Sequence, residues 1–316
     1  MKLLLYASLL AASWCCAQGY PAKPIRLVVP YGVGTPLDVL SRGVADKASA
    51  QLGQPIVVEV KPGAGGAVDA MDVLRQPADG YNLLVISMPM AVGQTIYRNV
   101  PFDLRQDFTP VGQIAAFYTV LVVHPSVAAN TVADLERLLK QHPGKFSFAS
   151  GGPGTPAHIA AELFKLRTST DALHVPYNQF PQAIADLLNG EHQFMFAATP
   201  PVVPHIKAGK LRALAVTSPE RIPALNDVPT MAQAGYPDFV VKDWIGIVAR
   251  TGTPREAIAK TNGAIAKALD NAQVKDLYAR LAAEPVSASP EMFRQLIESE
   301  VERWAAVAKA SHIRVE

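Results

Sequence analysis

The sequence predicts an α/β protein with a largely parallel β-sheet. Apolar, strand-like runs alternate with helix-like stretches along nearly the whole chain, and this alternation is typical of βαβ units. Two glycine-rich turns, residues 30–38 and 150–158, each join such a strand to such a helix. Two further apolar runs, residues 119–123 and 244–249, separate a first set of elements from a second set.

The elements follow from local patterns of apolar residues and turn residues. Thr131 and Asp134, for example, suit the start of a helix. The first set is a strand at 25–29, a helix at 37–52, a strand at 56–60, a helical stretch that the glycine-rich segment 63–66 opens and that runs to residue 74, and a strand at 83–87. The second set is a helix at 135–140, strand 146–149, helix 157–166, strand 172–175, helix 182–188, strand 193–197, a helical turn at 205–208 and strand 211–217.

Two helices, 256–270 and 290–310, complete the chain. In the second, apolar residues recur at helical spacing and predict a face that packs back on the first set: Phe293, Leu296, Ile297, Val301 and Trp304. The runs 119–123 and 244–249 have two interpretations, which the sequence supports equally. They are either paired crossings that form a hinge between two domains or ordinary core strands of one large sheet.

The N-terminus has the pattern of a secretory signal peptide. Lys2 is followed by an apolar stretch, residues 3–12, which is about half the length of a membrane span of roughly 20 residues. Small residues at 15 and 17 predict cleavage after Ala17, so residues 1–17 form the signal peptide. A lipid anchor at Cys15 or Cys16 and an ordinary buried N-terminal helix are the alternatives.

Composition restricts the classes of function. Both cysteines lie within the predicted signal peptide, so we expect no disulfide, no thiolate nucleophile and no cysteine-bound metal in the mature chain. The formal charge is +2, with 29 basic and 27 acidic residues. A nearly neutral chain without basic runs argues against nucleic-acid binding and against polybasic membrane docking.

The glycine-rich turns are the candidate binding elements. A strand–glycine turn–helix unit presents unpaired backbone N–H groups and the positive end of the helix, which suits an anion. In the first turn, Thr35 adds a hydroxyl and Pro36 suits a first helical turn. Asp38 is interpreted as a helix cap or a partner of Arg42, with contact to a ligand ammonium group as the alternative. Two such turns predict two half-sites facing each other across a cleft.

Motifs for cofactor, metal or catalysis are incomplete or missing in the sequence. The segment Gly63-Ala64-Gly65-Gly66 lacks the rest of a dinucleotide fingerprint, and neither a phosphate loop nor a nucleophile elbow occurs. The seven histidines have no metal-ligand spacing. His158 is interpreted as structural, because no acid is placed to orient it as a base for Ser150. We therefore expect no enzyme activity, no cofactor and no metal.

An ordered series of motifs resembles the extracytoplasmic solute receptors of tripartite tricarboxylate transporters, the TctC or Bug family. The first turn is similar to that family's first ligand loop, PFxxGGxxD…AR, and the second turn is similar to its second ligand loop. Between and after them come these matching segments in family order: Lys61 to Gly66, Asp79-Gly80-Tyr81, Phe102-Asp103, Asp107 to Pro110, His174 to Tyr177, Gly209 to Thr217, Arg221, Asp227 to Thr230 and Ala234-Gly235.

The resemblance implies a type II periplasmic-binding-protein fold, with two α/β domains that close on a small carboxylate about a two-strand hinge. We expect a first domain of residues 20–121 plus 246–316 and a second of residues 122–245. We also expect a periplasmic monomer that delivers its ligand to membrane permease subunits. The alternatives are a sensing receptor that feeds a signalling partner and an exported α/β hydrolase that uses Ser150 or His158. The expected ligand-binding residues are Tyr31, Gly32, Val33, Gly34, Thr35, Asp38, Ser87, Ser150, Gly152, Gly154, Thr155, His158, Tyr177 and Ala197.

Three departures from the family pattern bear on the ligand. Thr35 replaces the second glycine of the first loop, and Asn178-Gln179-Phe180 replaces a segment in which a basic residue and a glycine are usual. Ala197 stands where an aspartate is frequent. If residue 197 faces the ligand, the loss of that acceptor favours a carboxylate with an apolar or aromatic body over acidic amino acids.

Overall fold

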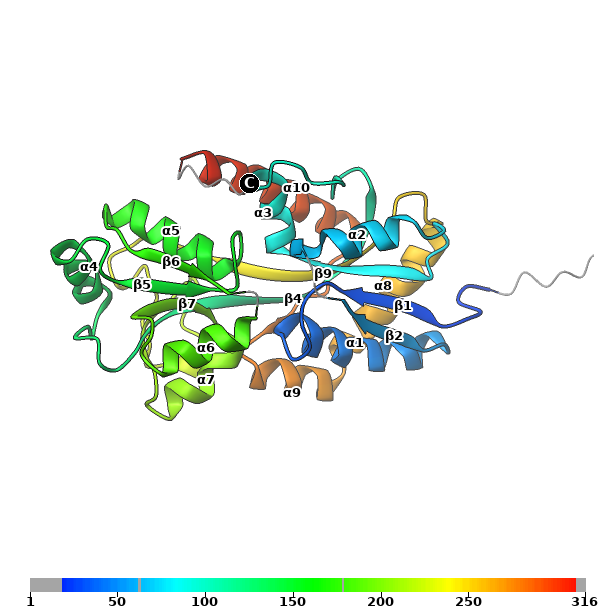
Figure 1. Cartoon of the computed structure of the whole chain (residues 1–316). Helices are drawn as coiled ribbons and strands as arrows, with labels where there is room; N and C mark the ends of the chain where they lie inside the picture. The colour runs from blue at the N-terminus through cyan, green and yellow to red at the C-terminus, as the bar shows by residue number, and fades with distance from the viewer. Residues whose placement is uncertain (1–18, 62–63, 178, 311–316) are drawn as a thin grey trace, which may run out of the picture.

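The chain alternates between strands and helices, as the sequence predicts. The computed structural model describes residues 19–61, 64–177 and 179–310, so the predicted signal peptide lies outside the described residues. Two groups of strands, each flanked by helices, lie on either side of two long central strands (Figure 1). The strands are β1 (Ile25–Val29), β2 (Ile56–Val60), β3 (Asn82–Ser87), β4 (Phe108–Val123), β5 (Ser147–Ser150), β6 (Leu173–Pro176), β7 (Phe194–Ala198), β8 (Arg212–Val216), β9 (Lys242–Arg250) and β10 (Glu284–Pro285).

The helices cover both faces of these strands (Figure 1). They are α1 (Pro36–Leu52), α2 (Ala67–Leu74), α3 (Met88–Ile96), α4 (Val132–Gln141), α5 (Pro156–Thr168), α6 (Phe180–Leu188), α7 (Thr199–Lys207), α8 (Arg255–Asp270), α9 (Ala272–Arg280) and α10 (Pro290–Ala310), with short 3₁₀ turns at Ala64–Gly66 and Pro223–Leu225. In the described part of the chain, no helix is both long and apolar enough to cross a bilayer.

The sheet is parallel within each group and antiparallel at its centre. Its order is β2-β1-β3-β9-β4-β7-β5-β6, and β8 and β10 also pair with β4. In the first group β1 is parallel to β2 and β3, and in the second group β5 is parallel to β6 and β7. The central strands β9 and β4 run antiparallel to each other and to the strands beside them. The predicted parallel sheet therefore holds only on the two sides of this centre.

The central strands are the two predicted crossings between the sets of elements. The first part of β4 pairs with β9, whereas its last residues, from Thr119 to Val123, pair with β7 and β8. Strand β9 starts beside Phe239 and Val241 in the core of the second group and ends against β3 in the first. Both runs that the sequence singles out thus lie on strands that connect the two groups.

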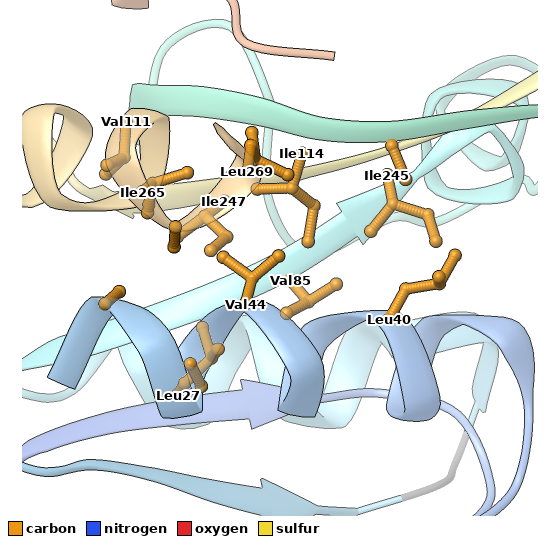
Figure 2. Packing of buried hydrophobic residues seen from close by; sticks show 14 of the residues in the cluster. Leu27, Leu40, Val44, Val85, Val111, Ile114, Ile245, Ile247, Ile265 and Leu269 are labelled. Carbon is orange, nitrogen blue, oxygen red and sulfur yellow. The ribbon is translucent and has the colours of Figure 1, made fainter. Parts of the chain in front are cut away.

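Each group of strands has its own hydrophobic cores. In the first group, Leu40 and Val44 of α1 face Ile265 and Leu269 of α8, next to side chains of β1, β3, β4 and β9 (Figure 2). On the other face of this group, α10 packs with α3 against β4 and β9. Phe293 of α10 lies so close to Gly246 of β9 that a Cβ atom there would approach its ring to 2.0 Å.

The apolar face of α10 packs as predicted. Phe293, Ile297, Val301 and Trp304 are buried in one core with Trp244 of β9, and Leu296 packs against it. The indole N–H groups of Trp244 and Trp304 both donate to Glu300, at 3.1 and 2.9 Å. The last predicted helix therefore does pack back on the first group of strands.

Candidate ligand-binding site

The two glycine-rich turns have nearly the same conformation. Each reads Gly-x-Gly-Thr-Pro, after β1 in one case and after β5 in the other. The second glycine of each motif has a positive φ, +80° at Gly34 and +78° at Gly154, which a residue with a side chain rarely adopts. Thr35 and Thr155 share extended φ/ψ values, −69°/158° and −68°/155°, and each is the N-cap of the helix that follows.

The same internal hydrogen bonds hold both turns. The hydroxyls of Thr35 and Thr155 donate to the carbonyls of Gly32 and Gly152, at 2.8 and 2.7 Å. Asp38 accepts the N–H of Gly34 at 3.0 Å, and Nδ1 of His158 accepts the N–H of Gly154 at 3.2 Å. Asp38 and His158 therefore play the same part, because each accepts the backbone N–H of the residue four positions before it and so holds its turn in shape.

These bonds decide which backbone donors stay free. The N–H groups of Gly34 and Gly154 are used within the turns, and Pro36 and Pro156 have no N–H. Among the described residues, the N–H groups of Leu37 and Ala157 have no hydrogen-bond partner. They lie in the first turns of α1 and α5, where unpaired donors and the helix dipole favour an anion.

One cavity joins the two turns. It has a volume of about 400 Å³, within the range of small-molecule sites. It lies at the carboxyl ends of β1, β3 and β5, where α/β sheets bind ligands. Its walls are formed by Tyr31, Gly32, Val33, Thr35, Pro36, Leu37, Ser87, Pro89, Phe117, Gly151, Thr155, Pro156, Ala157, Gln179, Phe180, Pro181, Ala198 and Asp243.

Four helices begin at this cavity. Helices α1, α3, α5 and α6 each place a proline of their first turn in its wall: Pro36, Pro89, Pro156 and Pro181. Their positive ends are the main source of positive potential, because no Lys, Arg or His is found among the described wall residues. The cavity is thus suited to an anion that is held by backbone groups rather than by a basic side chain.

The structure brings together six of the predicted binding residues and sets the others behind the wall. Tyr31, Gly32, Val33, Thr35, Ser87 and Thr155 line the cavity. Gly34, Asp38, Gly152, Gly154 and His158 are the framework of the turns, and Asp38 also forms a 2.6 Å ion pair with Arg42. Ala197 is fully buried in a core of the second group, and the next residue, Ala198, faces the cavity instead.

Ser150 and Tyr177 also lie behind the wall. Ser150 accepts the N–H of Gly152 at 3.0 Å and lies 2.7 Å from Nε2 of His174. Tyr177 donates to Asp186 at 2.7 Å, and its oxygen is 2.5 Å from Nε2 of His192. Both residues therefore support the second turn and its neighbours rather than reach into the cavity.

The histidine that pairs with Ser150 is His174 rather than His158. The rings of His158 and His174 stack with centroids 4.2 Å apart. Burial lowers the pKa of each histidine to about 4, and the positive charge of Lys165 lowers both pKa values further. The described part of the chain contains no group of three His, Cys, Asp or Glu residues arranged to hold a metal ion.

Several wall residues were missed by the sequence analysis. Phe117 of β4 and Asp243 of β9 come from the central strands, and Gln179, Phe180 and Pro181 come from the start of α6. In the sequence, Gln179 and Phe180 were noted only as part of a departure from the family pattern, not as binding residues. One signal was present for Asp243, a carboxylate placed directly before the apolar run 244–249. Phe117 gave no signal, because it lies within a strand that is buried along nearly its whole length.

Comparison with known proteins identifies the family. Residues 40–313 match the tripartite tricarboxylate transporter family receptor, TctC. The chain belongs to this family. It is 37% identical to protein BugT of Bordetella pertussis over 295 residues, which cover 93% of this chain and 90% of BugT. Members of the family are periplasmic solute-binding receptors rather than enzymes.

Solved structures of similar proteins share the fold. Rpa4515 of R. palustris, solved with adipate, superimposes with a TM-score of 0.88 at 32% identity, over 93% of this chain and 99% of Rpa4515. MatC of Rhodopseudomonas palustris, solved with bound malate, gives a TM-score of 0.84 at 28% identity over 91% of this chain and 99% of MatC. The fold is that of the TctC and Bug periplasmic binding proteins.

Proposed function

We propose that this TctC-family receptor captures a small carboxylate in the cavity between its two glycine-rich turns. The observation that carries the proposal is the matched pair of turns, which direct the free N–H groups of Leu37 and Ala157 and two helix N-termini at one cavity. Adipate and malate in the structures of related receptors support this ligand class.

The further parts of the proposal concern transport. The two domains are residues 20–121 plus 246–316 and residues 122–245, and they close about β4 and β9 as a hinge. The receptor is an exported periplasmic monomer that delivers its ligand to the membrane permease subunits of a tripartite transporter. Intact mass of exported protein tests the export signal. A mature chain that starts elsewhere than after Ala17, or a lipid-modified cysteine, contradicts it.

A thermal-shift screen followed by calorimetry tests the ligand class. A carboxylate present at a hundred times its Kd stabilises the folded protein by about 2.7 kcal/mol. Sulfate, phosphate and neutral sugars are the comparison compounds. Stabilisation by these compounds and by no carboxylate would overturn the proposal.

A pair of glycine variants shows whether binding takes place in this cavity. Gly32 lies in the wall, and a Cβ atom there meets no other atom within 4 Å. Gly32→Leu should therefore leave the fold intact and place its side chain against the cavity, so that binding is lost. Gly263→Leu in α8 is the matched control, because its Cβ also meets nothing within 4 Å and it lies outside the wall. Equal binding by both variants contradicts the site.

A further inference from the structure

The wall of the cavity contains one acidic side chain among the described residues, and its position gives it a role in choosing the ligand. Asp243 is the second residue of β9 and is only 4% exposed. Its cross-strand partner on β4 is Phe117, which also lines the cavity. An acidic group in the wall of a site for an anion is unfavourable unless something pairs with it.

The charge of Asp243 is not balanced by a basic residue. Oδ1 accepts the N–H of Trp244 at 2.8 Å, and the N–H of Met88 also stabilises the carboxylate. Lys242, the preceding residue, is engaged elsewhere: it forms an ion pair with Glu284 at 3.4 Å and lies over the ring of Tyr118. The other acid near Asp243 is Glu300 of α10, which adds negative charge. Burial, with this charge, raises the pKa of Asp243 to about 7.

Two hydroxyl groups of the same wall are also unused. Oη of Tyr31 and Oγ of Ser87 are buried and lie near each other, but neither forms a hydrogen bond of standard geometry with the described residues. Ser87 is the N-cap of α3, but its side chain makes no cap hydrogen bond. Buried polar groups without partners are rare in folded proteins. Asp243 and these hydroxyls therefore offer hydrogen bonds that a bound molecule can complete.

We propose that Asp243 is a specificity-determining acceptor, which selects carboxylates that carry a hydroxyl or ammonium group over the same acids without one. This inference rests on the proposed function, because it assumes that a carboxylate occupies the cavity. A donor on the ligand pairs with the buried acceptor, whereas an acid without a donor leaves Asp243 unpaired beside a second negative charge. Sites built to bond a polar group reject analogues that lack it more strongly than apolar pockets reject small changes of shape.

This inference replaces the expectation drawn from Ala197. That expectation required residue 197 to face the ligand, but Ala197 is buried in a core and Asp243 lines the cavity instead. The acceptor that the sequence analysis considered missing is therefore supplied from β9. The preferred ligand changes accordingly, from an acid with a purely apolar body to one that bears a donor.

Calorimetric titration with matched acids tests the inference. The sets are succinate, malate and aspartate; phenylacetate and mandelate; and hexanoate and 6-aminohexanoate, so that members of a set differ by a hydroxyl or amino group. At pH 8, where Asp243 is mainly ionised, at least one donor-bearing acid should bind the full mature protein about tenfold or more tighter than its matched acid. Asp243→Asn should reduce this ratio to about threefold or less.

Asp69→Asn is the matched control for the loss of a buried carboxyl. Asp69 is fully buried, and burial likewise raises its pKa, to about 6, but it does not line the cavity. Its variant should keep the wild-type ratio between matched acids. If Asp243→Asn does not fold, as judged by circular dichroism, Asp243→Ser takes its place.

The outcomes separate this inference from the proposed function. If the wild type binds carboxylates but prefers the donor-free member of every set, or if Asp243→Asn keeps the wild-type ratio, the role of Asp243 is refuted and the proposed function stands. If the wild type binds none of these acids and no other carboxylate, the proposed function fails and this inference fails with it.

Discussion

Gly34 and Gly154 hold equivalent places in the two turns, but they differ in what a side chain would meet. Both have a positive φ, +80° and +78°. A Cβ atom on Gly34 meets nothing within 4 Å, whereas one on Gly154 would lie 2.8 Å from Cδ1 of Ile96 and 3.4 Å from Cγ1 of Val92. Ile96 and Val92 belong to α3, which packs in the first group of strands. Gly154→Ala therefore pushes the second turn away from the first group, and Gly34→Ala does not.

The expected effects follow from these contacts. A residue with a side chain at positive φ costs about 1–2 kcal/mol in either turn. Overpacking adds about 1–3 kcal/mol for Gly154→Ala alone. We expect the contact between residue 154 and Ile96 to form when the two groups close on the ligand. The 1–3 kcal/mol of overpacking then weakens ligand binding by Gly154→Ala about 5- to 140-fold relative to Gly34→Ala, since 1.4 kcal/mol corresponds to a factor of ten.

Calorimetry and urea unfolding of both variants measure these effects, with the carboxylate that binds the wild type best. Ile96→Val removes the Cδ1 atom that the new Cβ would meet, at a cost of about 0.5–1.5 kcal/mol in stability. Combined with Gly154→Ala it should restore most of the lost affinity, and it should not improve Gly34→Ala. Equal losses of affinity in the two alanine variants, or no recovery in the double variant, would refute this account of the contact.

Three further predictions follow from the same structure. Burial lowers the pKa of His158 to about 4 in the folded protein, against about 6.5 in the unfolded chain. The free energy of unfolding should therefore fall by on the order of 3 kcal/mol as the pH drops from above 6.5 towards 4. Urea unfolding across this pH range should show a smaller fall for His158→Asn than for the wild type, and an equal fall counts against this role of His158. Gly246→Ala should destabilise the fold by about 1–3 kcal/mol, because the new Cβ meets the ring of Phe293. Gly263→Ala should not destabilise it, because its Cβ meets no atom within 4 Å. Thermal unfolding of the two variants compares their stabilities, and equal stabilities contradict the contact with Phe293. Solution scattering should show a smaller radius of gyration with saturating carboxylate than without it, and an unchanged radius contradicts the hinge.

Much of the fold could be predicted because its elements carry local signals. The turns before α1 and α5 contain the glycine, threonine and proline that their conformation requires, and the apolar stripe of α10 predicted its packing. Helix α3 was missed because six of its nine residues are buried, so it has no polar face to reveal a helical period. Most of α7 was missed because it contains Pro200, Pro201 and Pro204, residues that normally end a helix.

The wall of the candidate site could be predicted only in part, because proximity in the sequence does not show which way a side chain points. Both Gly-x-Gly-Thr-Pro turns form and border the cavity, yet Asp38 and His158 accept hydrogen bonds within the turns and do not line the wall. Neighbouring residues of a strand face opposite sides, which is why Ala198 lines the cavity and Ala197 does not. Asp243 reaches the site only because β9 crosses between the two groups of strands.

Backbone groups and side chains form different parts of the candidate site, and this explains why the class of ligand is easier to infer than the particular ligand. The groups suited to a carboxylate are backbone N–H groups and helix ends, and their positions depend on the Gly-x-Gly-Thr-Pro pattern. Asp38 and His158 differ chemically but accept the same kind of N–H, so a turn tolerates a change of side chain without losing its shape. The rest of the cavity wall is instead formed by side chains such as Phe117, Phe180 and Asp243, which come from separate elements. Under the proposed function, we expect a substitution at one of these positions to change which acid is bound and to leave the two turns unaltered, so that receptors with the same turns are able to bind different acids.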